Sequence, residues 1–458
     1  MQNKIKIGQQ LELTIDRLSF TGKGIGRDDN FVVFVPHTIP GDRIVAEITA
    51  VKRRYADARV AEYLQRSADA IPPRCPHFDL CGGCSFQNLP YELQLEAKLE
   101  AVTSHLTRIG KIENPPIQPI LPSEEIFFYR NKMEFSFKPD EEKHLTLGLH
   151  HRGEWASIFD VSDCQLQSET SNQIINRVRE FFSEHKTIAY HLSEHHGYLR
   201  YLTVRESRAD GSIMIILVTN AGELEYRDEF IAMITESFPQ VKSIVHIVNS
   251  AKANVATGEE PDILWGEDHI IEKIGGKSFK IRPTTFFQTN TRQTEKLYGQ
   301  IVELAEFSPD ENVLDLYTGC GSIALYISDL VNSVFGVELN PESITSAFEN
   351  TEINNVTNCD FIAGDVRKIL TDLIDQEKHY DTIITDPPRA GVGRKVIRKI
   401  MKLNPHKIVY VSCNPATLSE DLKELREGGY RLDKIVPVDM FPHTFHIESV
   451  SRLTREEP

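Results

Sequence analysis

Cys413 is the residue whose position in the sequence most directly suggests chemistry. It ends the apolar run KIVYVSC, residues 407–413, which predicts a buried strand, and Asn414 and Pro415 follow it. A thiolate at an exposed strand end can act as a nucleophile if its pKa is lowered or a base lies nearby. Added to carbon 6 of a uracil ring, it would make carbon 5 able to attack an electrophilic methyl group. A small buried hydrophobic residue is the simpler interpretation of Cys413 when it is considered alone.

The product of such an addition must lose the proton on carbon 5, which requires a general base. The tail segment PHTFHIE, residues 442–448, offers three groups of the right type, namely His443, His446 and Glu448. The residue types leave all three eligible. A surface carboxylate is the simpler interpretation of Glu448 when it is considered alone.

A ligand pocket is expected at the carboxyl ends of several strands in the C-terminal part of the chain. The stretch DLYTGCGS, residues 315–322, follows one apolar run, and Gly319 and Gly321 would let a ligand approach the backbone before a helix begins. Glu338 ends the second run and could accept hydrogen bonds from ribose hydroxyls. Asp365 ends the third run, in position for an adenine amine. Although a Gly-x-Gly turn alone is a weak signal, open α/β sheets bind ligands at these strand ends.

The motif Asp386-Pro-Pro-Arg389 ends the fourth apolar run. Amino-methyltransferases carry a similar Asp/Asn-Pro-Pro followed by an aromatic residue, so the arginine here favours a different methyl acceptor. With Cys413 at the end of the fifth run, this motif would flank the place of a methyl donor. The loop DLYTGCG resembles the S-adenosylmethionine (SAM) loop of class I methyltransferases rather than a Gly-x-Gly-x-x-Gly turn.

Four further cysteines have the number and spacing of a metal site. Cys75, Cys81 and Cys84 lie within ten residues of sequence, and Cys164 follows 80 residues after the last of them. Four thiolates can close a tetrahedral zinc site or hold a [4Fe–4S] cluster, and the spacing leaves both open. It does not match the C-x3-C-x2-C pattern of radical-SAM sites. Seven cysteines in all, with no export signal, argue against a disulfide framework.

The elements that must position these residues fall into three expected domains. Residues 1–66 alternate short β-like runs with Gly and Pro turns, which predicts a small barrel whose basic loops suit a nucleic-acid backbone. Residues 67–280 mix helical and strand-like runs around the four cysteines, which predicts a mixed α/β domain. In residues 281–458 apolar runs alternate with helical segments, which indicates a parallel sheet wrapped by helices.

Two finer predictions concern the central segment. A helix is expected from Tyr91 to Ile109, with a set of apolar side chains buried: Leu93, Ala97, Leu99 and Leu106. Three basic residues are candidate RNA contacts, although a solvated surface is the simpler interpretation of each: Arg130, Lys132 and Arg205.

The charge is unevenly distributed along the 458 residues. Residues 1–66 contain 11 Lys and Arg against 8 Asp and Glu, a net +3, which leaves −19 for the rest of a chain whose total is −16. A basic end on an acidic body fits local contact with a polyanion, but a solvated surface would have the same composition. The longest aliphatic stretch, IMIILV at residues 213–218, is too short to cross a bilayer. We expect a cytoplasmic monomer that does not contact membranes.

Several longer motifs together resemble the RNA uracil-5-methyltransferase family, nearest the iron–sulfur branch that modifies 23S ribosomal RNA. They are FFQTN (286–290), DLYTGCGS (315–322), GVELN (336–340), TDPPRAG (385–391), VSCNPATLSEDL (411–422) and PHTFHIESV (442–450). The resemblance covers essentially the whole chain. It implies a class I SAM-dependent methyltransferase domain of Rossmann-like fold behind an N-terminal TRAM barrel and a central α/β domain.

The resemblance also implies roles for individual residues. Cys413 would be the nucleophile, and Glu448, rather than either histidine, the base. The residues that bind SAM or the target base would be Gln288, Tyr317, Glu338 and Asp386, with Asp365 near the adenine and Ser322, Gly319 and Gly321 in the same pocket. Cys75, Cys81, Cys84 and Cys164 would hold a [4Fe–4S] cluster in preference to zinc. The flipped-out uracil would enter beside the methyl donor.

Three alternatives remain open at the level of sequence. The same cysteine chemistry serves a cytosine-5 RNA methyltransferase, whose acid must protonate cytosine N3. The substrate could be tRNA rather than 23S rRNA, because the motifs are shared. A cluster-stabilised RNA-binding protein without catalysis is a third possibility, but it would need neither Cys413 nor Glu448.

Overall fold

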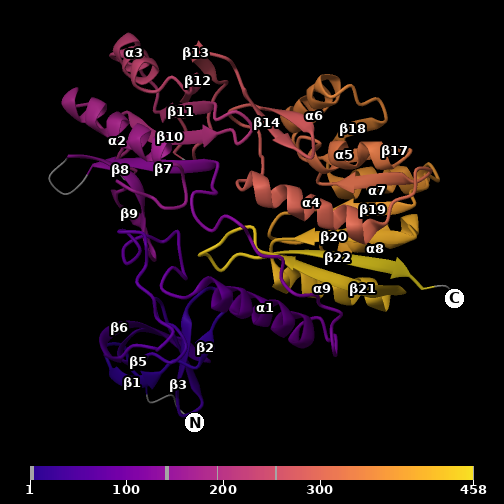
Figure 1. Ribbon diagram of the computed structural model, residues 1–458, viewed down its shortest axis with the longest axis horizontal. Helices are drawn as coiled ribbons and strands as arrows, with labels where there is room; N and C mark the ends of the chain where they lie inside the picture. Colours follow the sequence, from indigo (N-terminus) through magenta and orange to yellow (C-terminus); the bar gives the residue numbers. More distant parts are fainter. Residues whose placement is uncertain (1–4, 140–143, 193, 253–254, 457–458) are drawn as a thin grey trace.

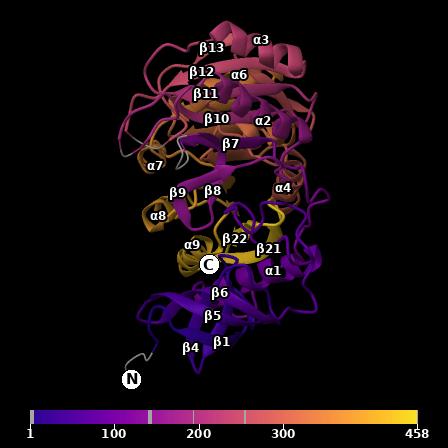
Figure 2. The same ribbon diagram turned by 90° about the vertical axis from the view of Figure 1, so that its left-hand side faces the viewer.

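The structure is a computed structural model that describes residues 5–139, 144–192, 194–252 and 255–456. Figure 1 shows three packed bodies, with the chain passing from the barrel through a central sheet to a second large sheet at the C-terminus. Figure 2 shows the barrel at one end of the molecule and the central sheet at the other. Within the described residues, no helix is both long and apolar enough to span a membrane.

The N-terminal body is a six-stranded barrel with the strand order β1-β5-β6-β4-β3-β2. Its strands are β1 (Gln10–Thr14), β2 (Arg17–Leu18), β3 (Gly24–Asp28), β4 (Phe31–Val35), β5 (Arg43–Val51) and β6 (Tyr55–Gln65). Alternating apolar residues fill its core, among them Val33, Ile44 and Ala46, none of which is exposed. The predicted small barrel is therefore confirmed.

The central body is a seven-stranded sheet with the order β13-β12-β11-β10-β7-β8-β9. Its strands are β7 (Lys132–Pro139), β8 (Leu145–His151), β9 (Glu154–Asp160), β10 (Leu199–Glu206), β11 (Ile213–Thr219), β12 (Val241–Val248) and β13 (Asp262–Gly266). Helices α2 (Glu169–Glu184) and α3 (Arg227–Ser237) pack on one face. The other face of β11 packs against the C-terminal body through Met214, Ile216 and Val218, which explains why all seven of its residues are buried.

The C-terminal body is a seven-stranded sheet with the order β18-β17-β16-β19-β20-β22-β21. Its strands are β16 (Asn312–Leu316), β17 (Ser333–Glu338), β18 (Cys359–Ala363), β19 (Thr382–Thr385), β20 (Lys407–Ser412), β21 (Tyr430–Val438) and β22 (Glu448–Arg455). The first five are parallel, and β22 is inserted antiparallel to both β20 and β21. The predicted doubly wound sheet is confirmed, and the strand order reverses beside β16, where such sheets bind ligands.

Helices connect and cover these strands. They are α4 (Thr291–Ala305), α5 (Ser322–Ile327), α6 (Pro341–Ile353), α7 (Val366–Asp375), α8 (Arg394–Leu403) and α9 (Pro415–Glu427), preceded by the hairpin β14 (Ile270–Ile274) and β15 (Lys277–Ile281). The side chains of α4 and of this hairpin share one core with strands β16 and β20 and with the inner face of the central sheet. The second and third bodies are thereby joined through a continuous apolar core.

Helix α1 (Tyr91–Arg108) lies between the barrel and the C-terminal sheet, where it packs against α9 (Figure 1). The expected helix is present, but the predicted buried face is wrong for all but one residue. Its buried side chains are Gln94, Lys98, Val102 and Leu106, spaced four apart, whereas Leu93, Ala97 and Leu99 are only partly buried. Two polar residues thus occupy the inward stripe of the helix.

The barrel contacts this assembly through its β2–β3 turn. Phe20 makes edge-to-face contacts with His105 of α1, at 5.1 Å between ring centroids, and with Phe445 of the C-terminal body, at 6.0 Å. Gly22 has a φ of +76°, and a Cβ there would lie 2.7 Å from Ser85. Only glycine allows this turn to approach the segment that follows Cys84 so closely.

Candidate active site

The loop between β16 and α5 forms the floor of the expected SAM pocket. Its backbone is left-handed at Tyr317, Gly319 and Gly321, with φ of 65°, 57° and 78°. A side chain at Gly321 would also meet Leu325 and Phe361 at 3.0 Å. These conformations turn the chain sharply from strand to helix, as the glycine spacing predicts.

Glu338 is joined to this loop by a hydrogen bond. The Gly319 N–H donates to Glu338 Oε2 at 3.2 Å, and the Asn340 N–H donates to Oε1 at 3.0 Å. The carboxylate is therefore fixed at the end of β17 beside the glycine turn, with part of its surface open. Ser322, at the start of α5, shares a 2.7 Å hydrogen bond with the Tyr298 hydroxyl. The structure thus brings Gly319, Gly321, Ser322 and Glu338 together.

Asp365 lies at the next strand end and is exposed. It is the N-cap of α7, and its Oδ1 accepts a hydrogen bond from the Lys368 N–H at 3.1 Å. One carboxylate oxygen therefore has a structural role, which leaves the other for a ligand. Two apolar side chains at the same edge are exposed and were not singled out from the sequence, Leu339 at 68% and Ile362 at 37%. Exposed apolar residues at this rim suit an adenine ring.

Gln288 belongs to a loop that the central body holds. The Asn131 N–H donates to the Thr289 carbonyl at 2.9 Å, and Asn131 Nδ2 donates to the Gln288 carbonyl at 3.1 Å. In the same loop Phe286 is 68% exposed, and its carbonyl faces the Cys320 thiol at 3.8 Å. Gln288 therefore lies next to the glycine turn, on a loop fixed from the opposite body.

Asp386, Cys413 and Glu448 come together at the carboxyl edge of the C-terminal sheet. Strands β20 and β22 pair in a register whose last pair is Ser412↔Ser449, so Cys413 and Glu448 are the next residues on each strand. Cys413 is partly buried, whereas Glu448 is only 5% exposed. The two residues therefore lie at the same edge of the C-terminal sheet, close enough for the Glu448 charge to raise the pKa of the Cys413 thiol.

Burial raises the pKa of all three acidic groups. Burial raises the pKa of Cys413 to about 12, with further contributions from the carboxylates of Glu448 and Asp386. Burial raises the pKa of Asp386 to about 6, and burial together with the Asp386 charge raises the pKa of Glu448 well above its usual range. At neutral pH Asp386 is ionised, whereas Cys413 holds its proton.

Arg389 is the cation that opposes the rise in the pKa of Cys413 and Glu448. It lowers the pKa of both Cys413 and Glu448, and its Nη2 lies 3.2 Å from His446 Nε2. Its backbone carbonyl accepts a hydrogen bond from Asn414 Nδ2 at 3.0 Å, which ties the Asp-Pro-Pro-Arg loop to the Cys413 loop. Arg389 was not among the site residues predicted from the sequence, although its place in the Asp-Pro-Pro-Arg motif was a usable signal.

The two histidines of the tail are not positioned alike. Burial and then Arg389 lower the pKa of His446 to about 4, so its imidazole is neutral beside the guanidinium. Burial and Lys98 lower the pKa of His443 to about 4, and its ring stacks on Phe127 at 4.3 Å between centroids. His443 is thus part of the protein interior, and Glu448 is the member of the three that faces Cys413.

The four remaining predicted cysteines gather at the edge of the central body. Burial raises the pKa of Cys84 to about 12 and that of Cys164 to about 11, and the other cysteines of the set raise both further. N–H groups point at the sulfurs: Gly83 N donates to Cys81 Sγ and Gln87 Nε2 to Cys84 Sγ, each at 3.3 Å. Such donors and the neighbouring Arg152 suit thiolates, which bind metal ions.

One of the suggested RNA contacts is wrong. Arg205 is 3% exposed, and its guanidinium donates to the carbonyls of Arg282 at 3.0 Å and Thr285 at 2.8 Å. It braces the segment before Gln288 from within and is inaccessible to RNA. Arg130 and Lys132 are partly exposed, and Arg130 Nε donates to the Lys132 carbonyl at 3.1 Å. For these two residues RNA contact stays a prediction.

The comparisons with known proteins identify the family of the chain. The family model described as tRNA (Uracil-5-)-methyltransferase matches residues 90–456, and the TRAM domain model matches residues 4–61. The chain belongs to the tRNA (uracil-5-)-methyltransferase family. The first match begins one residue before α1, in accord with the packing of that helix on the C-terminal body. The predicted family, the class I fold and the TRAM barrel are confirmed.

Relatives match over nearly their full lengths. An uncharacterized RNA methyltransferase of Halalkalibacterium halodurans is 37% identical over 97% of this chain and 96% of its own. Another, of Bacteroides thetaiotaomicron, is 39% identical over 94% of this chain and 98% of its own. The protein is therefore an RNA methyltransferase, and its interpretation as a non-catalytic RNA-binding protein is not supported.

A solved structure gives the same result for the fold and the cofactor. The tRNA (uracil-54, C5)-methyltransferase of Pyrococcus abyssi, in complex with S-adenosyl-L-homocysteine, is 30% identical and has a TM-score of 0.77. The similarity covers 97% of this chain and all of that one. SAM dependence of the family is in accord with the glycine turn and with Glu338 beside it.

Proposed function

We propose that this protein converts uridine to 5-methyluridine in 23S ribosomal RNA, with Cys413 as nucleophile and Glu448 as general base. The observation that carries the proposal is the placement of Cys413 and Glu448 at facing ends of two paired strands, next to Asp386 and Arg389. A uracil between the two side chains would meet the thiol at carbon 6 and the carboxylate at carbon 5. A nucleophile and a base are both needed here only in a mechanism in which a covalent adduct forms and is then resolved.

In the first step the Cys413 sulfur bonds to carbon 6, and the electrons of the carbon 5–carbon 6 double bond move toward the carbonyl at carbon 4. The Cys413 thiol must lose its proton for this, because burial raises its pKa to about 12. Asp386, whose pKa is about 6, is ionised at neutral pH and can accept that proton. Arg389 stabilises the negative charge that develops nearby.

SAM, when bound, supplies the electrophilic methyl group that carbon 5 attacks. Gln288, Tyr317, Gly319, Gly321, Ser322, Glu338 and Asp365 are the residues that would hold it or orient the base. In its ionised form Glu448 then removes the proton from carbon 5, the bond between sulfur and carbon 6 breaks, and the double bond re-forms. A raised pKa makes the Glu448 carboxylate a stronger base than an exposed glutamate.

The chemistry of the four-cysteine set supports a [4Fe–4S] cluster held by Cys75, Cys81, Cys84 and Cys164. Four thiolates can hold a tetrahedral zinc ion or a [4Fe–4S] cluster, and the resemblance of the sequence to the iron–sulfur branch of the family favours the cluster. Uracil methylation transfers no electron, so we assign the cluster a structural or RNA-contacting role.

A trapping experiment tests the nucleophile. RNA that contains 5-fluorouracil should form a covalent adduct that survives denaturing electrophoresis, because fluorine prevents proton removal at carbon 5. The Cys413→Ser variant should form none, and cytosine-containing RNA should not be methylated. Absence of the adduct with the native enzyme would remove Cys413 from the mechanism.

A second candidate substrate is tRNA, because the structurally similar Pyrococcus abyssi enzyme acts on uracil-54 of tRNA. Both RNAs, taken from cells that lack the protein, should be incubated with enzyme and SAM and then mapped for 5-methyluridine. We expect modification in 23S rRNA. Modification confined to tRNA would overturn the choice of substrate and leave the chemistry intact.

A further inference from the structure

The loop between β21 and β22, residues 439–447, is held by four separate parts of the chain. Its consecutive carbonyls at positions 440 to 443 each accept at least one hydrogen bond. The donors are Asn290 Nδ2 to Met440 at 3.0 Å, Lys98 Nζ to Phe441 at 3.0 Å, Tyr129 Oη to Pro442 at 3.0 Å, and the N–H groups of Ser85 and Phe86 to His443 at 2.7 and 3.0 Å. Figure 1 shows this loop leaving the C-terminal sheet toward the purple N-terminal segments.

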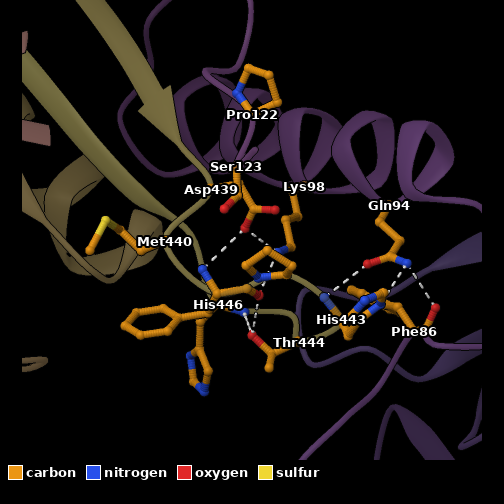
Figure 3. Close-up of polar contacts among 12 residues, drawn as sticks. Phe86, Gln94, Lys98, Pro122, Ser123, Asp439, Met440, His443, Thr444 and His446 are labelled. Atoms are coloured by element: carbon orange, nitrogen blue, oxygen red, sulfur yellow. Dashed lines mark hydrogen bonds and ion pairs between the residues drawn. The ribbon is translucent and has the colours of Figure 1, made fainter. Parts of the chain in front are cut away.

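A buried ion pair fixes the start of the loop. Lys98 Nζ lies 2.6 Å from Asp439 Oδ1, with side-chain exposures of 2% and 0%. Asp439 Oδ2 accepts a further hydrogen bond from the Tyr91 hydroxyl at 2.8 Å. Lys98 and Tyr91, both on α1, therefore bind the same carboxylate, as Figure 3 shows for Lys98. Burying such a pair contributes little net stability, and its best-attested use is to fix one arrangement of the chain.

The middle of the loop is fixed just as closely. His443 has a left-handed backbone with a φ of 65°, a conformation that costs energy for a residue other than glycine. Gln94 accepts from the His443 N–H at 3.0 Å and lies 3.2 Å from its Nδ1 (Figure 3). Contacts from α1 and from the segment after Cys84 hold this strained residue in place. Five residues further along the chain is Glu448.

We propose that Tyr129, Lys98 and Tyr91 are positioning residues for Glu448: by clamping residues 439–443 they set the carboxyl group against carbon 5 of the target uracil. The inference rests on the proposed role of Glu448 as base. Cys413 is positioned by other contacts, namely by β20 and by the hydrogen bond from Asn414 to the Arg389 carbonyl. Loosening the loop should therefore slow removal of the carbon 5 proton more than formation of the covalent adduct.

Tyr129→Phe is the sharpest test, because it deletes one hydroxyl and keeps the buried ring. Tyr430→Phe is its matched control: that hydroxyl also donates to a proline carbonyl, Pro405 at 3.0 Å, and the side chain is 3% exposed. Tyr91→Phe provides a second test on the other side of the loop. Loss of a hydrogen bond that contributes about 1.4 kcal/mol to the positioning of Glu448 corresponds to a roughly tenfold lower rate.

Two readouts are needed with uracil RNA and SAM: tritium release from carbon 5, and the fraction of enzyme in a covalent adduct. We expect Tyr129→Phe and Tyr91→Phe to release tritium about tenfold more slowly and to accumulate adduct, with KM for RNA unchanged. Tyr430→Phe should behave like the native enzyme. Iron content, measured alongside, should be the same in Tyr129→Phe and in the native enzyme if the variant leaves the proposed cluster site intact.

Glu448→Gln separates this inference from the function on which it rests. If Glu448→Gln accumulates adduct and both tyrosine variants resolve it at the native rate, the positioning role is overturned and the proposed base remains. If Glu448→Gln itself turns over normally, Glu448 is not the base. A tyrosine variant that is slow without accumulating adduct also overturns the inference, because it would then act on an earlier step.

Discussion

Cys413 and Glu448 stand opposite each other because an antiparallel strand is inserted into an otherwise parallel sheet. Strand β22 runs against β20 from the pair Lys407↔Thr454 to the pair Ser412↔Ser449, and the two side chains follow at that end. In a fully parallel sheet the residue at the start of a strand would lie at the opposite edge from Cys413. Because β22 runs antiparallel, its first residue, Glu448, lies at the same edge of the sheet as the residues that follow the carboxyl ends of the parallel strands.

Replacement of Cys413 by serine should abolish turnover while leaving RNA binding intact. A hydroxyl is a far weaker nucleophile than a thiolate, and the loss in kcat should be roughly 10⁴-fold or more. Single-turnover methyl transfer and RNA affinity, measured on the same preparation, check this. Retention of even a tenth of the native rate would contradict the covalent mechanism.

Replacement of Asp386 by asparagine should stabilise the folded protein as it inactivates it. Burial raises the folded pKa of Asp386 to about 6 from an ordinary 3.8, so the folded state binds more protons than the unfolded state between these values. Ionisation of Asp386 therefore destabilises the native enzyme as pH rises through that window. The difference in Tm, variant minus native, should be near zero at pH 3.5 and should increase up to pH 7.

The pH dependence of that difference is the decisive part of the measurement. Histidines such as His443 and His446 shift the stability of both proteins in the same way, so their contribution cancels in the difference. A difference in Tm that does not change with pH would mean that the pKa of Asp386 is the same in the folded and unfolded protein.

The Lys98–Asp439 pair should show strong energetic coupling. Lys98→Met leaves a buried carboxylate without its cation and should cost about 3–5 kcal/mol of unfolding free energy. Asp439→Asn should also destabilise, whereas the double variant should lose much less than the sum of the two. Urea unfolding of the four proteins gives the coupling. Additive losses would show that the two charges do not interact in the folded state.

Removal of one of the proposed cluster ligands should affect folding or RNA binding before it affects chemistry. We expect Cys81→Ala to lose iron, together with the visible absorption of the cluster, and to unfold at lower temperature. Cys359→Ala is a matched control, since Cys359 lies in the C-terminal sheet away from the set. Bound iron of about four per chain is expected in the native enzyme, and one zinc per chain would overturn the cluster. A folded Cys81→Ala protein with normal RNA affinity and no methyl transfer would contradict the structural role.

The sequence predicted the parallel strands well, because each is a short apolar run followed by a functional residue. The motifs at the ends of β16, β17, β18, β19 and β20 predicted that these residues share one edge of the sheet, and the strand order agrees. Strands β21 and β22 were not predicted, and the facing of Cys413 and Glu448 depends on them. Pairing between segments far apart in sequence is decided by tertiary packing, which residue patterns do not specify.

Helix α1 illustrates the same limit in another way. Its leucines suggested an apolar inward face, but the buried stripe begins with Gln94 and Lys98. Both are buried because their partners, Asp439 and His443, arrive from a loop more than 300 residues later. Polar residues four apart in line with Val102 and Leu106 were the signal that could have revealed the stripe. Arg205 was misjudged for a similar reason, since its carbonyl partners are not visible in the sequence.

The contact of Phe20 with both His105 and Phe445 means that the barrel is not an interchangeable attachment. A barrel transplanted from a relative would have to bring an aromatic ring to the same place, or leave a gap beside the segment that leads to Glu448. Natural exchange of such barrels between enzymes should therefore be rare unless both sides of this seam change together.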